Sequence, residues 1–118
     1  MQHPKPQKLT RILISLAQED SKILVEGKRD EMALVNGGID KSRIYRAAYR
    51  TCGYFEKLVS SPKNSRIVLL FDNDRSGRER TNRFVKYFNG YDAELDTSYM
   101  ESFRRSGIMY VEELNSLL

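Results

Sequence analysis

Two short apolar runs, each followed at once by acidic residues, constrain the fold of this chain most strongly. Residues 22–25 (KILV) precede Glu26, and residues 66–71 (RIVLLF) precede Asp72. Uninterrupted aliphatic and β-branched runs of this length are typical of strands buried on both faces of a parallel sheet. Such sheets bind ligands outside the carboxyl ends of their strands. We therefore expect Glu26, Asp72 and Asp74 to converge on one crevice.

Helical and strand patterns alternate along the rest of the chain. Apolar residues at helical spacing predict a first helix around 9–16, and further helices are expected at about 29–36, 53–60, 76–89, 99–105 and 111–118. Weaker strands are expected at 43–48 and 91–96. This order predicts an α/β fold with about four mainly parallel strands flanked by helices. Residues 1–8 are expected to form an irregular tail, and residues 9–118 a single domain.

Composition argues against several classes of protein. The 118 residues are 40% hydrophobic and 31% charged with a net charge of +4, which suits a globular domain with a polyanionic partner. The lone Cys52 cannot form an intramolecular disulfide, and the lone His3 argues against a histidine zinc site or a Ser-His-Asp triad. Because no apolar stretch is long enough to span a membrane, we expect a cytoplasmic protein without a membrane partner.

The acidic residues predict a metal site. Three carboxylates without counter-charges repel one another and raise one another's pKa values. A divalent cation relieves this repulsion, and oxygen-only ligands favour Mg²⁺ or Mn²⁺. Asp72 and Asp74 are two positions apart, so both point to the same side of an extended segment. Glu26, Asp72 and Asp74 are therefore the predicted metal ligands, at a site for phosphate chemistry.

Basic residues and glycines flank both acidic segments. Helix starts bind phosphate through free backbone N–H groups, and positive side chains beside them add to this attraction. The residues predicted to hold nucleic-acid phosphates are therefore Lys28, Arg29, Arg75 and Arg78, with Arg80 nearby. Gly27 and Gly77 are predicted to shape the two turns. Asp30 lies in the first turn of a predicted helix, where the helix dipole favours a negative charge.

Other interpretations compete. Glu26 could be a solvated strand end and Asp30 a simple helix cap, and polar turns favour Asp, Asn, Ser and Gly. An EF-hand calcium loop is excluded because Arg83 stands where a bidentate Glu is needed, and because the preceding segment is a strand. A haloacid-dehalogenase-type phosphatase also places Asp-x-Asp after a strand, with the first Asp as nucleophile. Here the usual following Thr is missing, and Glu26 would have no role.

The pattern Glu-Gly-x-x-Asp after one strand and Asp-x-Asp-x-x-Gly after a later one resembles the Toprim domain. Topoisomerases, bacterial primases, OLD-type nucleases, recombination mediators and the ribonuclease that matures 5S ribosomal RNA share that domain. Residues 23–34 (ILVEGKRDEMAL) are especially similar to this ribonuclease and to small stand-alone archaeal Toprim proteins. The resemblance covers residues 22–96 and implies a Rossmann-like Toprim fold. It also implies that Glu26 is the general acid or base, that Asp72 and Asp74 hold Mg²⁺, and that Asp30 is a supporting acid.

By this resemblance we expect Mg²⁺-dependent phosphodiester cleavage or phosphoryl transfer on nucleic acid, with RNA favoured over DNA, as in ribosomal RNA processing. The alternative is a non-catalytic Toprim module that binds nucleic acid or acts as a scaffold in replication, recombination or repair. The chain is too short for the tyrosine domain of topoisomerases or the zinc and template-binding parts of primases. We therefore expect dependence on a protein partner or on self-association.

A second basic segment, residues 41–54, interleaves arginines with Tyr45, Tyr49 and Tyr54. One interpretation is an RNA surface on which bases stack against the tyrosines. The other is that the tyrosines pack against the sheet while the arginines stay in solvent. We expect the second arrangement, because aromatic side chains usually serve cores.

Overall fold

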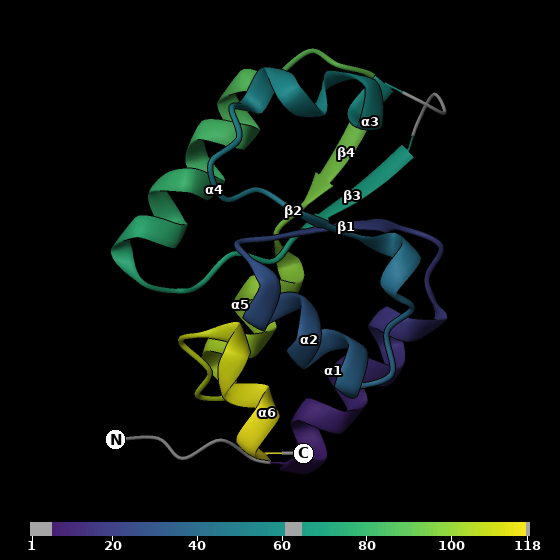
Figure 1. Cartoon of the computed structure of the whole chain (residues 1–118), viewed down its shortest axis with the longest axis vertical. Helices are drawn as coiled ribbons and strands as arrows, with labels where there is room; N and C mark the ends of the chain where they lie inside the picture. Colours follow the sequence, from purple (N-terminus) through teal and green to yellow (C-terminus); the bar gives the residue numbers. More distant parts are fainter. Residues whose placement is uncertain (1–5, 61–64, 118) are drawn as a thin grey trace.

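A four-stranded parallel sheet between helices forms the centre of the molecule, in a computed structural model that describes residues 6–60 and 65–117 (Figure 1). The strands are β1 (Lys22–Val25), β2 (Ile44–Arg46), β3 (Ser65–Leu69) and β4 (Ala93–Asp96). Their order across the sheet is β2-β1-β3-β4, and every neighbouring pair is parallel. The predicted α/β fold with four parallel strands is therefore confirmed.

Helices cover the sheet on both sides. Two helices lie on one side, α3 (Glu56–Ser60) and α4 (Arg75–Tyr87). Four lie on the other side, α1 (Pro6–Gln18), α2 (Lys28–Asn36), α5 (Ser98–Arg105) and α6 (Leu114–Leu117) (Figure 1). Short 3-10 turns complete the described elements, η1 (Lys41–Arg43), η2 (Cys52–Phe55) and η3 (Val111–Glu113). In the described part of the chain, no helix is both long and apolar enough to cross a membrane.

The central strands are buried as their apolar runs predict. Every residue from Ile23 to Val25 in β1 and from Ile67 to Leu69 in β3 is fully buried. The apolar side of α1 and the C-terminal segment pack into the same core, through Leu9, Leu16 and Phe103 among others. Since burial of an aliphatic side chain contributes roughly 1.5–3 kcal/mol, these two strands hold the layers together.

Several predicted boundaries are wrong. Helix α1 begins at Pro6, so residues 6–8 are helical and not part of an irregular tail; residues 1–5 lie outside the described residues. Proline fits the first helical turn because the N–H that it lacks would have no partner there. Strand β2 has three residues in place of the six predicted, and β3 ends at Leu69 although Leu70 and Phe71 remain buried. The helix predicted at 53–60 is divided into η2 and α3.

The chain reverses its course across the sheet beside β1. It passes from β1 to β2 at one edge and then crosses to β3 on the other side of β1. Strands β1 and β3 pair directly, with Leu24 beside Leu69, and the Leu70 N–H donates to the Leu24 carbonyl oxygen at 2.8 Å. Ligands bind α/β sheets at such a reversal, outside the carboxyl ends of the strands. Glu26 and Asp72 follow β1 and β3 at this place.

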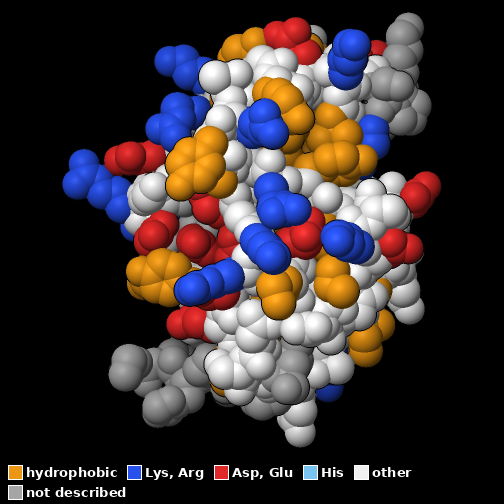
Figure 2. All heavy atoms as spheres, viewed as in Figure 1, with side chains coloured by type: hydrophobic (Ala, Val, Ile, Leu, Met, Phe, Trp, Pro, Cys, Tyr) orange, Lys and Arg blue, Asp and Glu red, His pale blue; other side chains and the backbone are white. Residues whose placement is uncertain are grey.

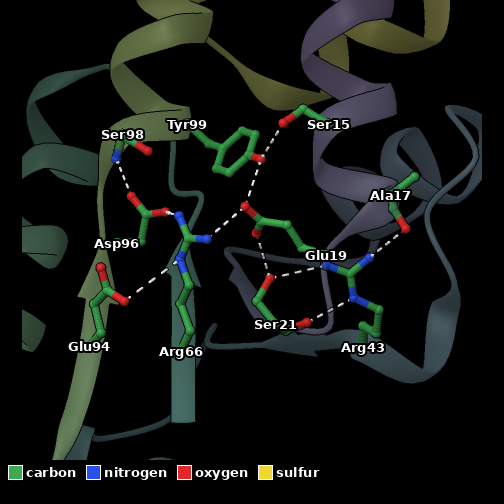
Figure 3. Close-up of polar contacts among 10 residues, drawn as sticks. All are labelled: Ser15, Ala17, Glu19, Ser21, Arg43, Arg66, Glu94, Asp96, Ser98 and Tyr99. Atoms are coloured by element: carbon green, nitrogen blue, oxygen red, sulfur yellow. Dashed lines mark hydrogen bonds and ion pairs between the residues drawn. The ribbon is translucent and has the colours of Figure 1, made fainter. Parts of the chain in front are cut away.

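An ionic network near the start of β3 joins the sheet to α1 and α5 (Figure 3). The Arg66 guanidinium lies 2.7 Å from Glu19 and 4.0 Å from Glu94, and it also pairs with Asp96. Burial alone would raise the pKa of Asp96, but hydrogen bonds from Ser98 and Arg66 outweigh it and hold the pKa below its usual value. Arg66 therefore compensates three carboxylates at once.

We predict that Arg66→Met lowers the free energy of unfolding by roughly 1–3 kcal/mol near neutral pH, because it leaves these carboxylates without their cation. Arg66 is partly exposed, which keeps the loss below that of a fully buried pair. Since the pKa of Asp96 is lowered in the folded state, its stabilisation is present above about pH 4 and is lost as the pH falls further. In urea unfolding, the difference in the free energy of unfolding between Arg66→Met and wild type should thus become smaller as the pH falls below about 4.

The exposed Arg105, which pairs with Glu101 within α5, provides the matched control. Arg105→Met should change stability by less than about 0.5 kcal/mol. Equal effects of the two substitutions would contradict the role given to Arg66.

Candidate functional site

The structure brings the four predicted acidic side chains into one electrostatic neighbourhood. Burial raises the pKa of Asp72 to about 6, against a hydrogen bond from the Val111 N–H that lowers it. The negative charges of Asp30, Asp74 and Glu26 raise the pKa of Asp72 further. We call Glu26, Asp30, Asp72 and Asp74 the acidic cluster. Figure 2 shows acidic side chains gathered in the left half of the view, with Lys and Arg side chains around them.

Asp30 and Asp74 stand at the starts of helices α2 and α4. The Gly27 N–H donates to Asp30 Oδ2 at 2.9 Å, and the Gly77 N–H donates to Asp74 Oδ1 at 2.8 Å. These bonds satisfy N–H groups that a helix start leaves unpaired, and they fix the direction of each carboxylate. The interpretation of Asp30 as a helix cap is thus confirmed. Each bond uses only one carboxylate oxygen, so capping does not prevent a second role.

The C-terminal segment holds the turn that carries Asp72. The Val111 N–H donates to Asp72 Oδ1 at 2.9 Å. The Asn73 N–H donates to the Met109 carbonyl oxygen at 2.6 Å, and the Asn73 side-chain amide donates to the Ile108 carbonyl oxygen at 3.3 Å. Asn73 therefore has a structural role between two acidic residues. Sequence patterns could not reveal these contacts, because most of the partners are backbone groups about forty residues away.

Arg80 of α4 places a cation beside the acidic cluster. Its Nε lies 3.4 Å from Glu26 Oε2, and its terminal nitrogen donates to the Ala47 carbonyl oxygen at 2.8 Å. The side chain is 19% exposed, so the pair is shielded from solvent more than most surface ion pairs. From its sequence position Arg80 is expected beside the turn after Asp72, near phosphate-binding residues, but its guanidinium instead neutralises Glu26.

The four residues predicted to hold phosphates occupy different surroundings. Lys28 and Arg29 are exposed in the first turn of α2, where Arg29 lies 3.9 Å from Glu112. Arg75 is exposed at the start of α4 and pairs with a glutamate one turn further along at 3.1 Å. Arg78 lines a hollow of about 630 Å³ between α4 and α5. Three of the four are therefore at helix starts next to the acidic cluster.

The two predicted turn glycines differ. A Cβ at Gly77 would lie 1.9 Å from the carbonyl oxygen of Asp72, so only glycine lets α4 start this close to the preceding turn. At Gly27 the backbone is extended (φ −152°, ψ −166°), and a Cβ would meet no atom within 4 Å. Neither the backbone angles nor the surroundings require glycine at Gly27.

Two of the three tyrosines in residues 41–54 lie at the surface. Tyr49 is fully exposed and Tyr54 is 59% exposed, whereas Tyr45 packs partly against the core. The expectation that these tyrosines pack against the sheet is therefore wrong for Tyr49 and Tyr54. Their segment is held by turn and loop contacts that leave the rings outside.

The acidic cluster suits a hard cation by chemistry but is not gathered around one point. Carboxylate oxygens are the ligands that Mg²⁺ prefers. The pKa of Asp72 is raised first by burial and then by neighbouring negative charges, and a cation would offset those charges. Within residues 6–60 and 65–117, however, no three Asp, Glu, His or Cys side chains lie in an arrangement that could hold a metal ion. Direct coordination by Glu26, Asp72 and Asp74 would thus require their side chains to move together.

We predict that Asp72→Asn stabilises the metal-free protein by about 1–2 kcal/mol near pH 7. The folded state binds the Asp72 proton more tightly than the unfolded state, so wild-type stability falls as the pH rises from about 4 to about 6. The variant lacks this loss, while its amide oxygen can still accept from Val111. Urea unfolding in EDTA should show equal stabilities near pH 4 and a more stable variant near pH 7. A variant less stable than wild type near pH 7 would contradict the repulsion described here.

Comparisons with known proteins identify relatives but no activity. No protein-family model matches the chain. It is similar to a UPF0292 protein of Thermococcus onnurineus (27% identical over 114 residues, 94% of this chain and 84% of that one) and to one of Pyrococcus abyssi (28% over 109 residues, 90% and 80%). A solved structure of a protein from Aquifex aeolicus matches with a TM-score of 0.79 at 20% identity, over 89% of this chain and 96% of that one. This match shows the fold alone. None of these names mentions a Toprim domain, so that resemblance stays a prediction, but the likeness to small archaeal proteins is shown.

Proposed function

We propose that this protein is a Toprim-type enzyme that cleaves phosphodiester bonds, or transfers phosphoryl groups, on nucleic acid with Mg²⁺ or Mn²⁺. The observation that supports this best is the acidic cluster near the ends of β1 and β3, in which Asp72 lies within the field of three other carboxylates. Such a concentration of like charge is costly without a cation, and perturbed carboxylates of this kind are common at functional sites. The preference for RNA rests on the likeness of residues 23–34 to the 5S ribosomal RNA ribonuclease.

The chemistry proposed for the site divides between proton transfer and phosphate binding. A bound divalent cation would supply charge neutralisation at the phosphate and a lower pKa for a coordinated water. Glu26 is the group proposed to hold or release the proton at the attacking or leaving oxygen. Lys28, Arg29 and Arg75 are proposed to hold neighbouring backbone phosphates, which positions the strand without reading its sequence.

A non-catalytic role is the second candidate, and the pair between Glu26 and Arg80 favours it. A general base that is neutralised by a guanidinium 3.4 Å away is less available for proton transfer. In that case the protein would bind nucleic acid, or assemble with a protein partner or a second copy, without cleaving. The two candidates differ in one measurable respect, namely whether bound nucleic acid is cut when metal is added.

We predict that the purified protein cleaves labelled RNA only when Mg²⁺ or Mn²⁺ is present, and that Glu26→Gln and Asp72→Asn each lower the rate at least a hundredfold. General acid–base catalysis contributes about 10²–10⁴ to a rate, which sets this size. Both substitutions preserve side-chain shape, so thermal melting should show folded variants. Structured RNA, single-stranded DNA and supercoiled plasmid should be compared in the same assay.

Glu79→Gln is the matched control, because Glu79 is an exposed carboxylate on α4 that pairs with Arg75 rather than with the acidic cluster. It should leave cleavage within about twofold of wild type, since an exposed pair of this kind is weak. Unchanged rates in the Glu26 and Asp72 variants would remove the catalytic assignment.

A further inference from the structure

The exposed tyrosines form a surface that the acidic cluster does not use. A hollow of about 690 Å³ runs along the edge strand β2 and is lined by Gly27, Lys28, Arg46, Tyr49, Arg50 and Tyr54 among others. A second hollow, of about 670 Å³, shares Tyr45 and Tyr54 with it and extends to Lys22 and Lys57. Figure 2 shows hydrophobic and basic side chains interleaved over the region where Figure 1 places β2 and α3. We call this surface the tyrosine groove.

Tyr49 occupies a backbone conformation that its side chain does not favour. Its φ is +64°, the one positive value at a non-glycine position in the described residues. The Arg50 N–H donates to the Ala47 carbonyl oxygen at 3.0 Å, which closes a tight turn around Tyr49. Glycine or asparagine is usual at such a position, and a tyrosine there costs on the order of 1 kcal/mol. The Tyr49 ring is fully exposed, so burial within the protein does not offset this cost.

The neighbouring ring is positioned by a cation. The Arg50 guanidinium carbon lies 4.3 Å from the centre of the Tyr54 ring, a cation–π contact. Tyr54 also packs edge-on against the buried Phe55, with ring centres 5.0 Å apart. Tyr54 is therefore held in place while more than half of its surface faces solvent. By contrast, Tyr87 bonds to Glu56 and packs against Phe88, so its ring has partners within the protein.

The groove adjoins the acidic cluster through the backbone. The Ala48 N–H donates to the Glu26 carbonyl oxygen at 2.9 Å, so the Tyr49 turn extends the sheet beside Glu26. Arg80 binds both Glu26 and the Ala47 carbonyl oxygen, which fixes the turn and the cluster relative to each other. A ligand chain that lies in the groove would therefore reach the acidic cluster at the Gly27 and Lys28 end.

We propose that the tyrosine groove binds a single-stranded segment of nucleic acid, with bases stacked on Tyr49 and Tyr54. Exposed aromatic rings with Arg46 and Arg50 beside them suit the bases and phosphates of a strand, and the net charge of +4 favours a polyanion. A duplex keeps its bases stacked inside, so its bases could not reach these rings. One carboxylate, Glu31, lines the groove, but it is buried and lies 3.6 Å from Arg46. Single-stranded nucleic acid is thus the substrate form for the proposed function. Only the course of the strand from the groove toward the acidic cluster rests on that function.

The test is fluorescence anisotropy with labelled oligouridylate of about 12 nucleotides, a length within the range that small binding folds cover. EDTA is present throughout, so that cleavage does not intervene. Wild type should bind this strand more tightly than a duplex of the same length. Tyr49→Asn and Tyr54→Leu should each raise the Kd about tenfold, because loss of one base stack weakens binding by about five- to 150-fold. Tyr49→Phe and Tyr54→Phe keep the ring and should stay within about twofold.

Stability and salt dependence separate stacking from other causes. Asparagine accepts a positive φ, so Tyr49→Asn should melt close to wild type while binding is weakened. The tyrosine variants should keep the wild-type slope of log K against log salt. Arg50→Gln should reduce that slope by about 0.7, the value for one lost phosphate contact with a single strand. These two signatures cannot both follow from partial unfolding.

Binding that is unchanged in Tyr49→Asn and Tyr54→Leu would overturn the proposal, as would a preference for duplex or binding of an acidic peptide with no binding of oligonucleotide. Tyrosine-dependent binding without any metal-dependent cleavage would refute the proposed catalysis and leave the groove intact. Metal-dependent cleavage that does not depend on the tyrosines would refute the groove as the substrate site and leave the proposed catalysis intact.

Discussion

Carboxylates that are partly buried beside other carboxylates are the constraint on which the candidate site depends. Asp72 lies in the field of Glu26, Asp30 and Asp74, and the burial of Asp72 and Asp30 makes this repulsion harder for solvent to screen. The fold holds them through backbone N–H donors at two helix starts and in the C-terminal segment, and through the guanidinium of Arg80. These contacts fix where the carboxylates lie but supply only one full positive charge. The remaining imbalance is what a metal ion or a protonated carboxyl would remove.

The same elements connect the acidic cluster to the tyrosine groove. Strand β1 ends at Val25, and the segment after β2 continues the backbone pairing as far as Glu26. Arg80 binds on both sides of this junction, so movement of Glu26 toward a cation would have to release or carry along the guanidinium that also holds the Ala47 carbonyl oxygen. In the proposed enzyme, binding in the tyrosine groove and movement of the carboxylates would therefore affect each other through Arg80.

The sheet could be predicted well from the sequence because strands buried on both faces, such as β1 and β3, have continuous apolar runs. The sequence predicted the approach of Glu26 to Asp72 because parallel strands end at one edge of a sheet. It did not predict the pair of Arg80 with Glu26, because a single arginine in a helix carries no sign of its partner. Tyr49 was misjudged for a related reason, since an aromatic residue usually indicates a core and its positive φ leaves no trace in composition. The hydrogen bonds between residues 108–111 and the turn that carries Asp72 depend largely on backbone groups, which leave no sequence pattern.

Anomalous diffraction from crystals grown with Mn²⁺ tests the central claim most directly. We predict an anomalous peak within direct coordination distance of the carboxylate oxygens of Glu26, Asp72 and Asp74, with these side chains closer together than in the metal-free protein. A peak elsewhere on the molecule, or crystals grown with Mn²⁺ that show no ion among these carboxylates, would contradict the proposed metal site.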